Sequence, residues 1–213
     1  MGTMNTLLRF RRRLLIIPLV LAAVSAAYGG DDDKYQTDAK RLAQELNWQE
    51  GSVVADVGAG GGEIMLAAAK VVGTTGRVYA TELDRKKLTS LQGLALKEKN
   101  ISVQEAGVEQ TNLPSACCDS IFMRLVYHHL TRPAEIDASL LQSLKPGGLL
   151  AVFDEEPKPG SKRVEGVPEN RGGHGVPEKI VIDELTLAGF QFVKSFEEWP
   201  DQHYCVVFRK PNP

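Results

Sequence analysis

The chain has 213 residues, of which 43% are hydrophobic and 24% are charged. This composition is typical of one globular domain with a sizeable core, and it excludes a disordered or fibrous protein. Four arginines fall in the first 13 residues; without them, 21 Lys and Arg stand against 27 Asp and Glu, a net charge of −6. Because an acidic domain repels phosphate backbones, no nucleic-acid partner is expected.

The first 27 residues have the layout of an export signal. Arginines precede an apolar run from Leu14 to Ala27, which is shorter than the roughly 20 residues that a membrane-spanning helix needs. Small residues end the run, so one interpretation is a signal peptide cleaved near Ala26 or Ala27, and the other is an uncleaved membrane anchor. Either one predicts an exported, periplasmic or membrane-anchored protein. Residues 28–36 are interpreted as a linker and 37–213 as the folded domain.

Strand-like and helix-like segments alternate along the domain. Strands are predicted at 52–57, 77–83, 101–106, 119–126, 149–156, 190–199 and 203–210, and helices at 39–48, 62–72, 84–100, 133–144 and 178–189. Such alternation predicts right-handed βαβ units, and the short turn before the last segment predicts antiparallel pairing there. The expected fold is α/β, a Rossmann-like doubly wound sheet of seven strands, mostly parallel with an antiparallel C-terminal strand.

The segment VVADVGAGGGEIML joins the first predicted strand to a helix through four glycines in five positions. The dinucleotide fingerprint GxGxxG fails here, because its third glycine falls on Glu63. The spacing is instead DxGxGxG, formed by Asp56, Gly58, Gly60 and Gly62. Carboxylates at both ends of the loop oppose a pyrophosphate. This disfavours a nicotinamide oxidoreductase and favours a ligand without phosphate.

DVGAGGG resembles the first motif of the class I S-adenosylmethionine (SAM) dependent methyltransferases, and later segments resemble that family in order. RVYATELD ends at Glu82, which matches the family's acidic residue at the ribose hydroxyls, while Asp84 is expected to cap the next helix. GVEQTNLP resembles the segment beside the adenine, although the family's usual Gly-Asp is Gly107-Val108 here and Glu109 is the nearest substitute. SIFMRLVYHHL and LKPGGLLAVFDEE resemble the fourth and fifth strands with their flanking segments.

The C-terminal segment GGHGVPEKIVIDELTLAGF is similar to that of a subset of small, often exported bacterial methyltransferases. The resemblance implies SAM as cofactor and methyl transfer to a small-molecule acceptor. A catalytically inactive module that binds SAM or an adenosine-like ligand on the same fold is the alternative, since export would separate the protein from the SAM supply. The cofactor contacts that the resemblance implies are Asp56, Gly58, Ala59, Gly60, Gly62, Glu82, Leu83, Val108, Glu109 and Arg124.

Histidines are the candidate catalytic residues. His128 and His129 follow the fourth predicted strand, where open α/β sheets bind ligands, and a neutral imidazole there can accept a proton from the acceptor. Packing against the sheet is the alternative role. His174 lies in a long Gly- and Pro-rich loop that is expected to form a lid carrying His174 and Arg171 over the acceptor. No HxH, HxxxH or HxxE spacing occurs, so no metal site is expected.

The three cysteines are Cys117, Cys118 and Cys205. Adjacent cysteines rarely bridge each other, so two interpretations stay open. Cys205 pairs with one of the other two in an oxidising compartment, or all three are small buried residues of strands. Trp48 and Trp199 are expected to be packing residues.

Overall fold

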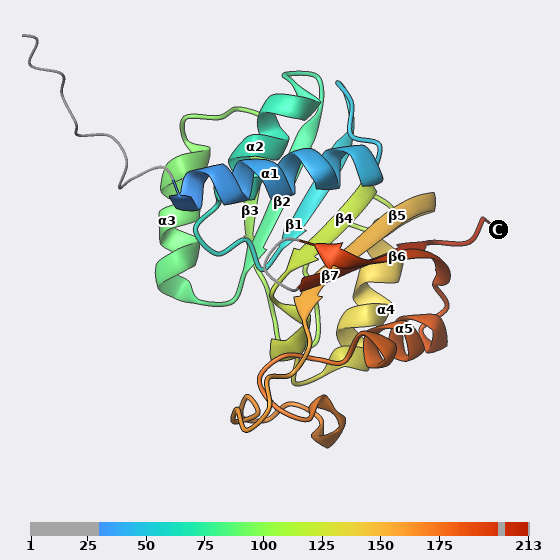
Figure 1. The fold of residues 1–213 in the computed structure, drawn as a ribbon. Coiled ribbons are helices and arrows are strands. Elements are labelled where there is room, and N and C mark those ends of the chain that lie inside the picture. Colours follow the sequence, from blue (N-terminus) through green and yellow to red (C-terminus); the bar gives the residue numbers. More distant parts are fainter. Residues whose placement is uncertain (1–29, 200–202, 213) are drawn as a thin grey trace, which may run out of the picture.

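The computed structural model describes residues 30–199 and 203–212, and a single sheet of seven strands forms its centre (Figure 1). The strands are β1 (Val53–Val57), β2 (Arg77–Glu82), β3 (Ile101–Glu105), β4 (Cys118–Arg124), β5 (Leu144–Glu155), β6 (Gln191–Trp199) and β7 (His203–Arg209). Their order across the sheet is β3-β2-β1-β4-β5-β7-β6. The pairs from β3 to β5 are parallel, and β7 runs antiparallel to both β5 and β6. The predicted fold class is confirmed.

Helices cover both faces of the sheet (Figure 1). They are α1 (Gly30–Glu45), α2 (Glu63–Val72), α3 (Arg85–Ala95), α4 (Pro133–Ser143) and α5 (Glu178–Leu187), with short 3₁₀ turns η1 (Tyr127–His129) and η2 (Glu169–Arg171). Apolar residues of α1, α2 and α3 pack in one core cluster, and those of α4 and α5 pack in a second. This doubly wound arrangement brings β1 and β4 together at the point where the strand order reverses, the usual place for a ligand.

Helix α1 begins at Gly30, so the expectation that residues 28–36 are a linker is wrong for the helical part of that range. Its apolar residues Ala39, Leu42 and Leu46 are buried in the core, and this burial holds the helix on the sheet. The predicted export segment lies at residues 1–27, outside the described residues. Within the described ranges, no helix combines the length and the apolar character needed to cross a membrane.

A buried polar contact fastens α1 to the sheet. Asp38 accepts hydrogen bonds from Nε of Arg124, at 2.8 Å, and from Nε1 of Trp199, at 2.7 Å. The Asp38 side chain is 2% exposed and that of Arg124 is 12% exposed. The three residues come from α1, β4 and β6, so a single carboxylate links three separate parts of the fold. Trp48 and Trp199 are both buried, as expected.

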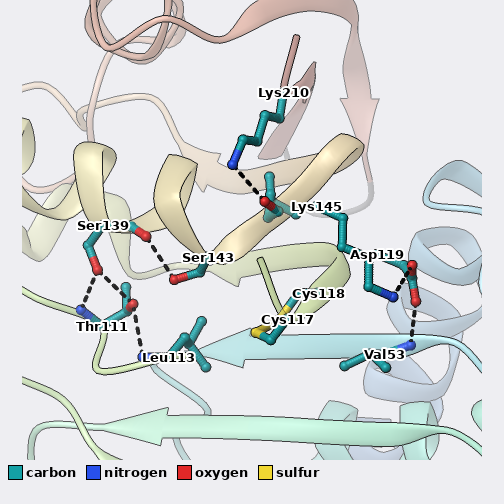
Figure 2. The surroundings of a disulfide bond; sticks show 11 residues. Val53, Thr111, Leu113, Cys117, Cys118, Asp119, Ser139, Ser143, Lys145 and Lys210 are labelled. Atoms are coloured by element: carbon teal, nitrogen blue, oxygen red, sulfur yellow. Dashed lines mark hydrogen bonds and ion pairs between the residues drawn. A yellow bond between two sulfur atoms is a disulfide. The ribbon is translucent and has the colours of Figure 1, made fainter. Parts of the chain in front are cut away.

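The expectation that Cys117 and Cys118 would not bridge is wrong, because their sulfur atoms are bonded to each other (Figure 2). Successive side chains of a strand point to opposite faces, but only Cys118 belongs to β4, and the preceding turn has φ 48° at Ala116. The chain therefore turns enough at this point for the two sulfurs to meet. Cys205 is a free, buried residue of β7, which excludes its proposed pairing.

Candidate functional site

A cavity of about 480 Å³ opens beyond the carboxyl ends of β1, β2 and β4. The residues that line it come from the glycine loop, the ends of β2 and β4, and the segments that follow β3 and β4. They are Val57, Gly58, Gly60, Thr81, Glu82, Leu83, Asp84, Lys87, Ala106, Gly107, Val108, Gln110, Thr111, Arg124, Leu125, Val126, His129, Leu130, Thr131 and Ile136. The cavity therefore occupies the switch point predicted for a ligand.

The glycine loop folds closely against the chain that follows β4. The backbone N–H groups of Gly58 and Ala59 donate to the carbonyl oxygen of Thr81, at 2.9 and 3.0 Å. Gly58 has φ 77°, and a Cβ added there would lie 2.5 Å from Cγ2 of Val126. A larger residue at this position would be strained and would also clash. The need for glycine here is thus a matter of close approach between two loops.

Glu82 carries the most organised carboxylate in the cavity. Its Oε2 accepts from the N–H of Gly60 at 3.0 Å, and its Oε1 accepts from the N–H groups of Leu83 at 2.8 Å and Asp84 at 3.0 Å. The side chain is thereby fixed between the glycine loop and the end of β2. Asp84 caps α3 by accepting from two backbone N–H groups, as expected.

Thr81 and Val126 line the cavity but were not among the predicted contacts. The hydroxyl oxygen of Thr81 is buried without a hydrogen-bond partner among the described residues. Thr81 directly precedes Glu82 at the strand end, and Val126 follows β4. Their positions at strand ends were the signal that could have identified both residues.

The glycine loop is strongly acidic. Burial is the largest cause that raises the pKa of Asp56 to about 8; the nearby carboxylates of Glu82 and Glu63 also raise it, and Arg124 lowers it. Asp56 lies beneath the loop and does not line the cavity. Such surroundings favour a cationic ligand group and disfavour pyrophosphate.

Two apolar side chains stand at the rim of the cavity with unusual exposure. Leu83 is 54% exposed and Val108 is 53% exposed, and both line the cavity. Flat apolar surface of this kind is suited to a nucleobase. Glu109 was expected to replace the family's Asp, but it lies outside the cavity lining and is 3.9 Å from Arg132. The structure does not place Glu109 in the cavity lining, and its contact with the cofactor stays a prediction.

Three other predicted contacts differ in their roles. Ala59 and Gly62 are not part of the cavity lining; Gly62 instead occupies the N-cap of α2 with φ 89°. Arg124 does line the cavity, but its Nε bonds Asp38 and its guanidinium lies over the rings of Tyr35 and Phe153, at 4.9 and 5.0 Å. Among the predicted contacts, those that line the cavity are therefore Gly58, Gly60, Glu82, Leu83, Val108 and Arg124.

The structure brings His128, His129 and His174 together, although they come from η1 and from the long loop after β5. One ligand-type atom from each lies within 4.8 Å of the others. Only His129 lines the cavity. The pKa of His129 lies below its ordinary value, mainly because the ring is partly desolvated and also because the rings of His128 and His174 lie beside it. This imidazole is therefore neutral at pH 7.

The other two histidines are held by carboxylates. His128 is 2% exposed, and its Nδ1 lies 2.6 Å from Oδ1 of Asp154. Nδ1 of His174 lies 3.2 Å from Oε1 of Glu155. The sequence spacing gave no reason to expect this cluster, since it depends on how the loop folds back over the end of β5.

The proposed role of Arg171 in a lid over the acceptor is wrong. Its side chain is fully buried, its Nη1 and Nη2 donate to the two carboxylate oxygens of Glu184 at 2.9 Å each, and its guanidinium lies 5.5 Å from the centre of the Tyr127 ring. A buried bidentate pair of this kind fixes the loop on α5. Arg171 therefore supports the loop that carries His174.

Asp137 makes the stability of this part of the fold depend on pH. Tyr127 donates to Oδ2 of Asp137 at 2.9 Å, and Glu184 and Arg171 are its charged neighbours. The pKa of Asp137 is raised to about 7, mainly by burial and also by the charge of Glu184. The hydrogen bond from Tyr127 and the charge of Arg171 act in the opposite direction. The folded protein therefore retains a proton on Asp137 between about pH 4 and 7, where the unfolded chain has lost it.

Because the folded-state pKa is raised, the contribution of Asp137 to stability is complete below about pH 4 and is lost as the pH rises to about 7. We expect the free energy of unfolding to fall over this window with a slope from this group of at most about 1.4 kcal/mol per pH unit. Asp137→Asn retains an acceptor for Tyr127 and should remove that part of the slope. Urea unfolding at pH 5, 6 and 7 measures it; equal slopes for both proteins would contradict the assignment.

The comparisons with known proteins agree with this geometry. A family model described as a methyltransferase domain matches residues 55–152. The tRNA U34 carboxymethyltransferase of Desulfotalea psychrophila is 29% identical over 189 residues, which cover 82% of this chain and 57% of that protein. The ubiquinone/menaquinone biosynthesis C-methyltransferase UbiE of Pseudomonas aeruginosa is 29% identical over 119 residues, covering 54% and 46% of the two chains.

Among solved structures, a SAM dependent methyltransferase from Aquifex aeolicus superposes with a TM-score of 0.69 at 24% identity, covering 84% of this chain and 98% of that one. This likeness concerns the fold. The chain spans about half the length of the curated relatives it matches. The glycine loop, the fixed carboxylate of Glu82 and the cavity between them lie in or beside the matched segment. Residues 55–152 therefore resemble a methyltransferase domain, and the fold is that of a SAM dependent methyltransferase structure.

Proposed function

We propose that this chain transfers the methyl group of SAM to a small-molecule acceptor. The observation that carries the proposal is the carboxylate of Glu82, which three backbone N–H groups hold at the wall of a cavity formed by the glycine loop. A buried carboxylate organised in this way is suited to accept hydrogen bonds from a pair of vicinal hydroxyls. The ribose of SAM carries such a pair.

The residues of the cavity fit the remaining parts of SAM. Leu83 and Val108 offer apolar surface for the adenine, and the carboxylates of Glu63 and Glu82 near the glycine loop favour the ammonium group. The unpartnered hydroxyl of Thr81 is a further polar contact. Bound there, SAM supplies an electrophilic methyl group. The chain itself then has to orient the acceptor and exclude water.

The far wall of the cavity belongs to the segment after β4, where the acceptor would bind. This wall is largely apolar, because it contains Val126, Leu130 and Ile136. His129 lies beside these residues and can take up a proton. A neutral His129 can take a proton from an acceptor hydroxyl, thiol or acidic carbon. His128 and His174 do not line the cavity, so direct proton transfer by either is not part of the proposal.

The names of the relatives suggest two acceptor classes, tRNA and quinone precursors. We favour the small molecule, because the domain after residue 27 has a net charge of −6 and an acidic surface opposes a polyanion. The apolar wall of the cavity also fits a compact organic acceptor.

Transfer of labelled methyl from SAM tests the proposal. The purified chain is incubated with SAM and either a panel of quinols, phenols and thiols or total tRNA, and the label is located by extraction. Label in a small molecule, lost in Glu82→Ala, is the expected result. Label in tRNA would contradict the acceptor class, and no transfer to any fraction would favour the inactive ligand-binding module.

We also propose that the protein is exported through residues 1–27, either cleaved or anchored. The basic residues and the short apolar run support this. N-terminal sequencing of the protein from its native cell distinguishes the two forms. An intact N-terminus on cytoplasmic protein would contradict export.

A further inference from the structure

We propose that His128, His129 and His174 bind a divalent metal ion of the zinc type at the edge of the cofactor cavity. The three ring centroids lie 4.0, 4.6 and 5.6 Å from one another, and one nitrogen from each lies within 4.8 Å of the other two. Three imidazoles are a common ligand set for Zn²⁺ with one position left open.

A second observation independently points to a ligand at this place. Nε2 of His128 is buried and has no hydrogen-bond partner among the described residues. Its other ring nitrogen is occupied by Asp154, at 2.6 Å. When Nδ1 of a neutral His128 donates its hydrogen bond to that carboxylate, the lone pair of the ring lies on Nε2. A buried lone pair without a partner costs about 1–3 kcal/mol, and coordination of a metal ion would satisfy it.

Carboxylates support the ligands as they do in known metal sites. Asp154 is fully buried and also accepts from the backbone N–H groups of His128, at 3.1 Å, and Glu155, at 2.8 Å. Glu155 in turn holds Nδ1 of His174, at 3.2 Å. Hydrogen bonds of this kind orient metal-binding imidazoles and increase their basicity. The two acidic side chains also balance the charge of a divalent ion.

Only a small movement is needed to close the site. Nitrogen ligands at about 2.1 Å from Zn²⁺ lie roughly 3.4 Å apart in a tetrahedron, somewhat closer than the present limit of 4.8 Å. His128 is fixed by Asp154, whereas the His174 side chain is 45% exposed and His129 faces the cavity. Rotation of these two rings toward His128 would complete the ligand set.

The open coordination position would face the cavity, because His129 is the ligand that lines it. On the proposed methyltransferase function, a heteroatom of the acceptor would be held there, opposite the glycine loop. This role of the open position depends on the proposed function. The metal site itself rests only on the three histidines and their carboxylates.

Equilibrium dialysis of the full chain against Zn²⁺, followed by metal analysis, tests the site. We expect one Zn²⁺ per chain, loss to background in the double variant His129→Ala/His174→Ala, and a 10- to 100-fold weaker affinity in Asp154→Asn. Asp183→Asn, which changes an exposed carboxylate of α5, is the control and should retain the metal. Circular dichroism verifies that each variant is folded.

Zinc retained by the folded double variant, or no zinc bound by the wild type, would overturn the proposal. Co²⁺ substitution adds a spectroscopic readout, since azide should shift the visible absorption bands if a position is open. Unchanged bands would overturn the open position. Titration of the same preparations with S-adenosylhomocysteine (SAH) separates the two proposals: SAH binding without zinc removes only the metal site, and zinc without SAH binding removes only the methyltransferase function.

Discussion

Replacing Glu82 with alanine is expected to weaken the binding of SAH by about 100-fold or more. Each hydrogen bond to a charged group contributes about 1.5–3 kcal/mol, and a factor of ten in affinity corresponds to about 1.4 kcal/mol. The substitution removes the carboxylate proposed for the ribose. It also releases the N–H groups of Gly60 and Leu83 that now donate to it. Isothermal titration of wild type and variant measures the change.

Glu105 provides the matched control, because it pairs with Glu82 in the register of β2 and β3. Its side chain is exposed, lies 3.7 Å from Arg85 and is not part of the cavity lining. Glu105→Ala should therefore leave the SAH affinity within about twofold, since exposed pairs of this kind contribute little. Similar losses in both variants would show that general charge, and not the organised carboxylate, governs binding.

Asp38→Ala is expected to lower the free energy of unfolding by about 3–5 kcal/mol, the usual cost of removing one partner from a buried ion pair. The variant leaves the guanidinium of Arg124 and the indole N–H of Trp199 without the carboxylate that now accepts from both. Urea unfolding of the wild type and the variant measures the loss. A large effect would also confirm that α1 is an integral part of the domain.

Asp183→Ala is the comparison for an exposed pair. Asp183 lies 2.6 Å from Lys179 one turn away on α5, and its side chain is 55% exposed. Its loss should cost no more than about 0.5 kcal/mol. A comparably small cost for Asp38→Ala would contradict the structural role assigned to the buried contact.

The sheet and the glycine loop could be predicted because their signals are local. Apolar runs with short turns predicted all seven strands, and the resemblance to the methyltransferase motifs implied that Glu82, at the end of β2, contacts the cofactor. Gly58 shows what a local pattern cannot reveal. The sequence shows a glycine at this position, but the reason that no larger residue fits there is the close approach of Val126, about 70 residues later in the chain. Such contacts depend on strand order.

The errors arose where a residue's role depends on a distant partner. Arg171 lies in a polar, Gly- and Pro-rich loop, yet it is fully buried against Glu184 of α5. Glu109, whose Oε1 lies 3.9 Å from Nε of Arg132, is not among the residues that line the cavity. The three histidines meet only because the long loop returns to the end of β5, so their sequence spacing carried no metal signature. The residues next to these positions in the sequence show neither the distant contact partner nor the course of the long loop.

Calorimetric titration of the full chain with SAH shows whether the cavity beside Glu82 binds the methyl donor. We expect one site per chain, with an affinity that falls about 100-fold or more in Glu82→Ala and is retained in Glu105→Ala. No detectable binding by the folded wild-type protein would contradict the proposed cofactor site, whatever the acceptor.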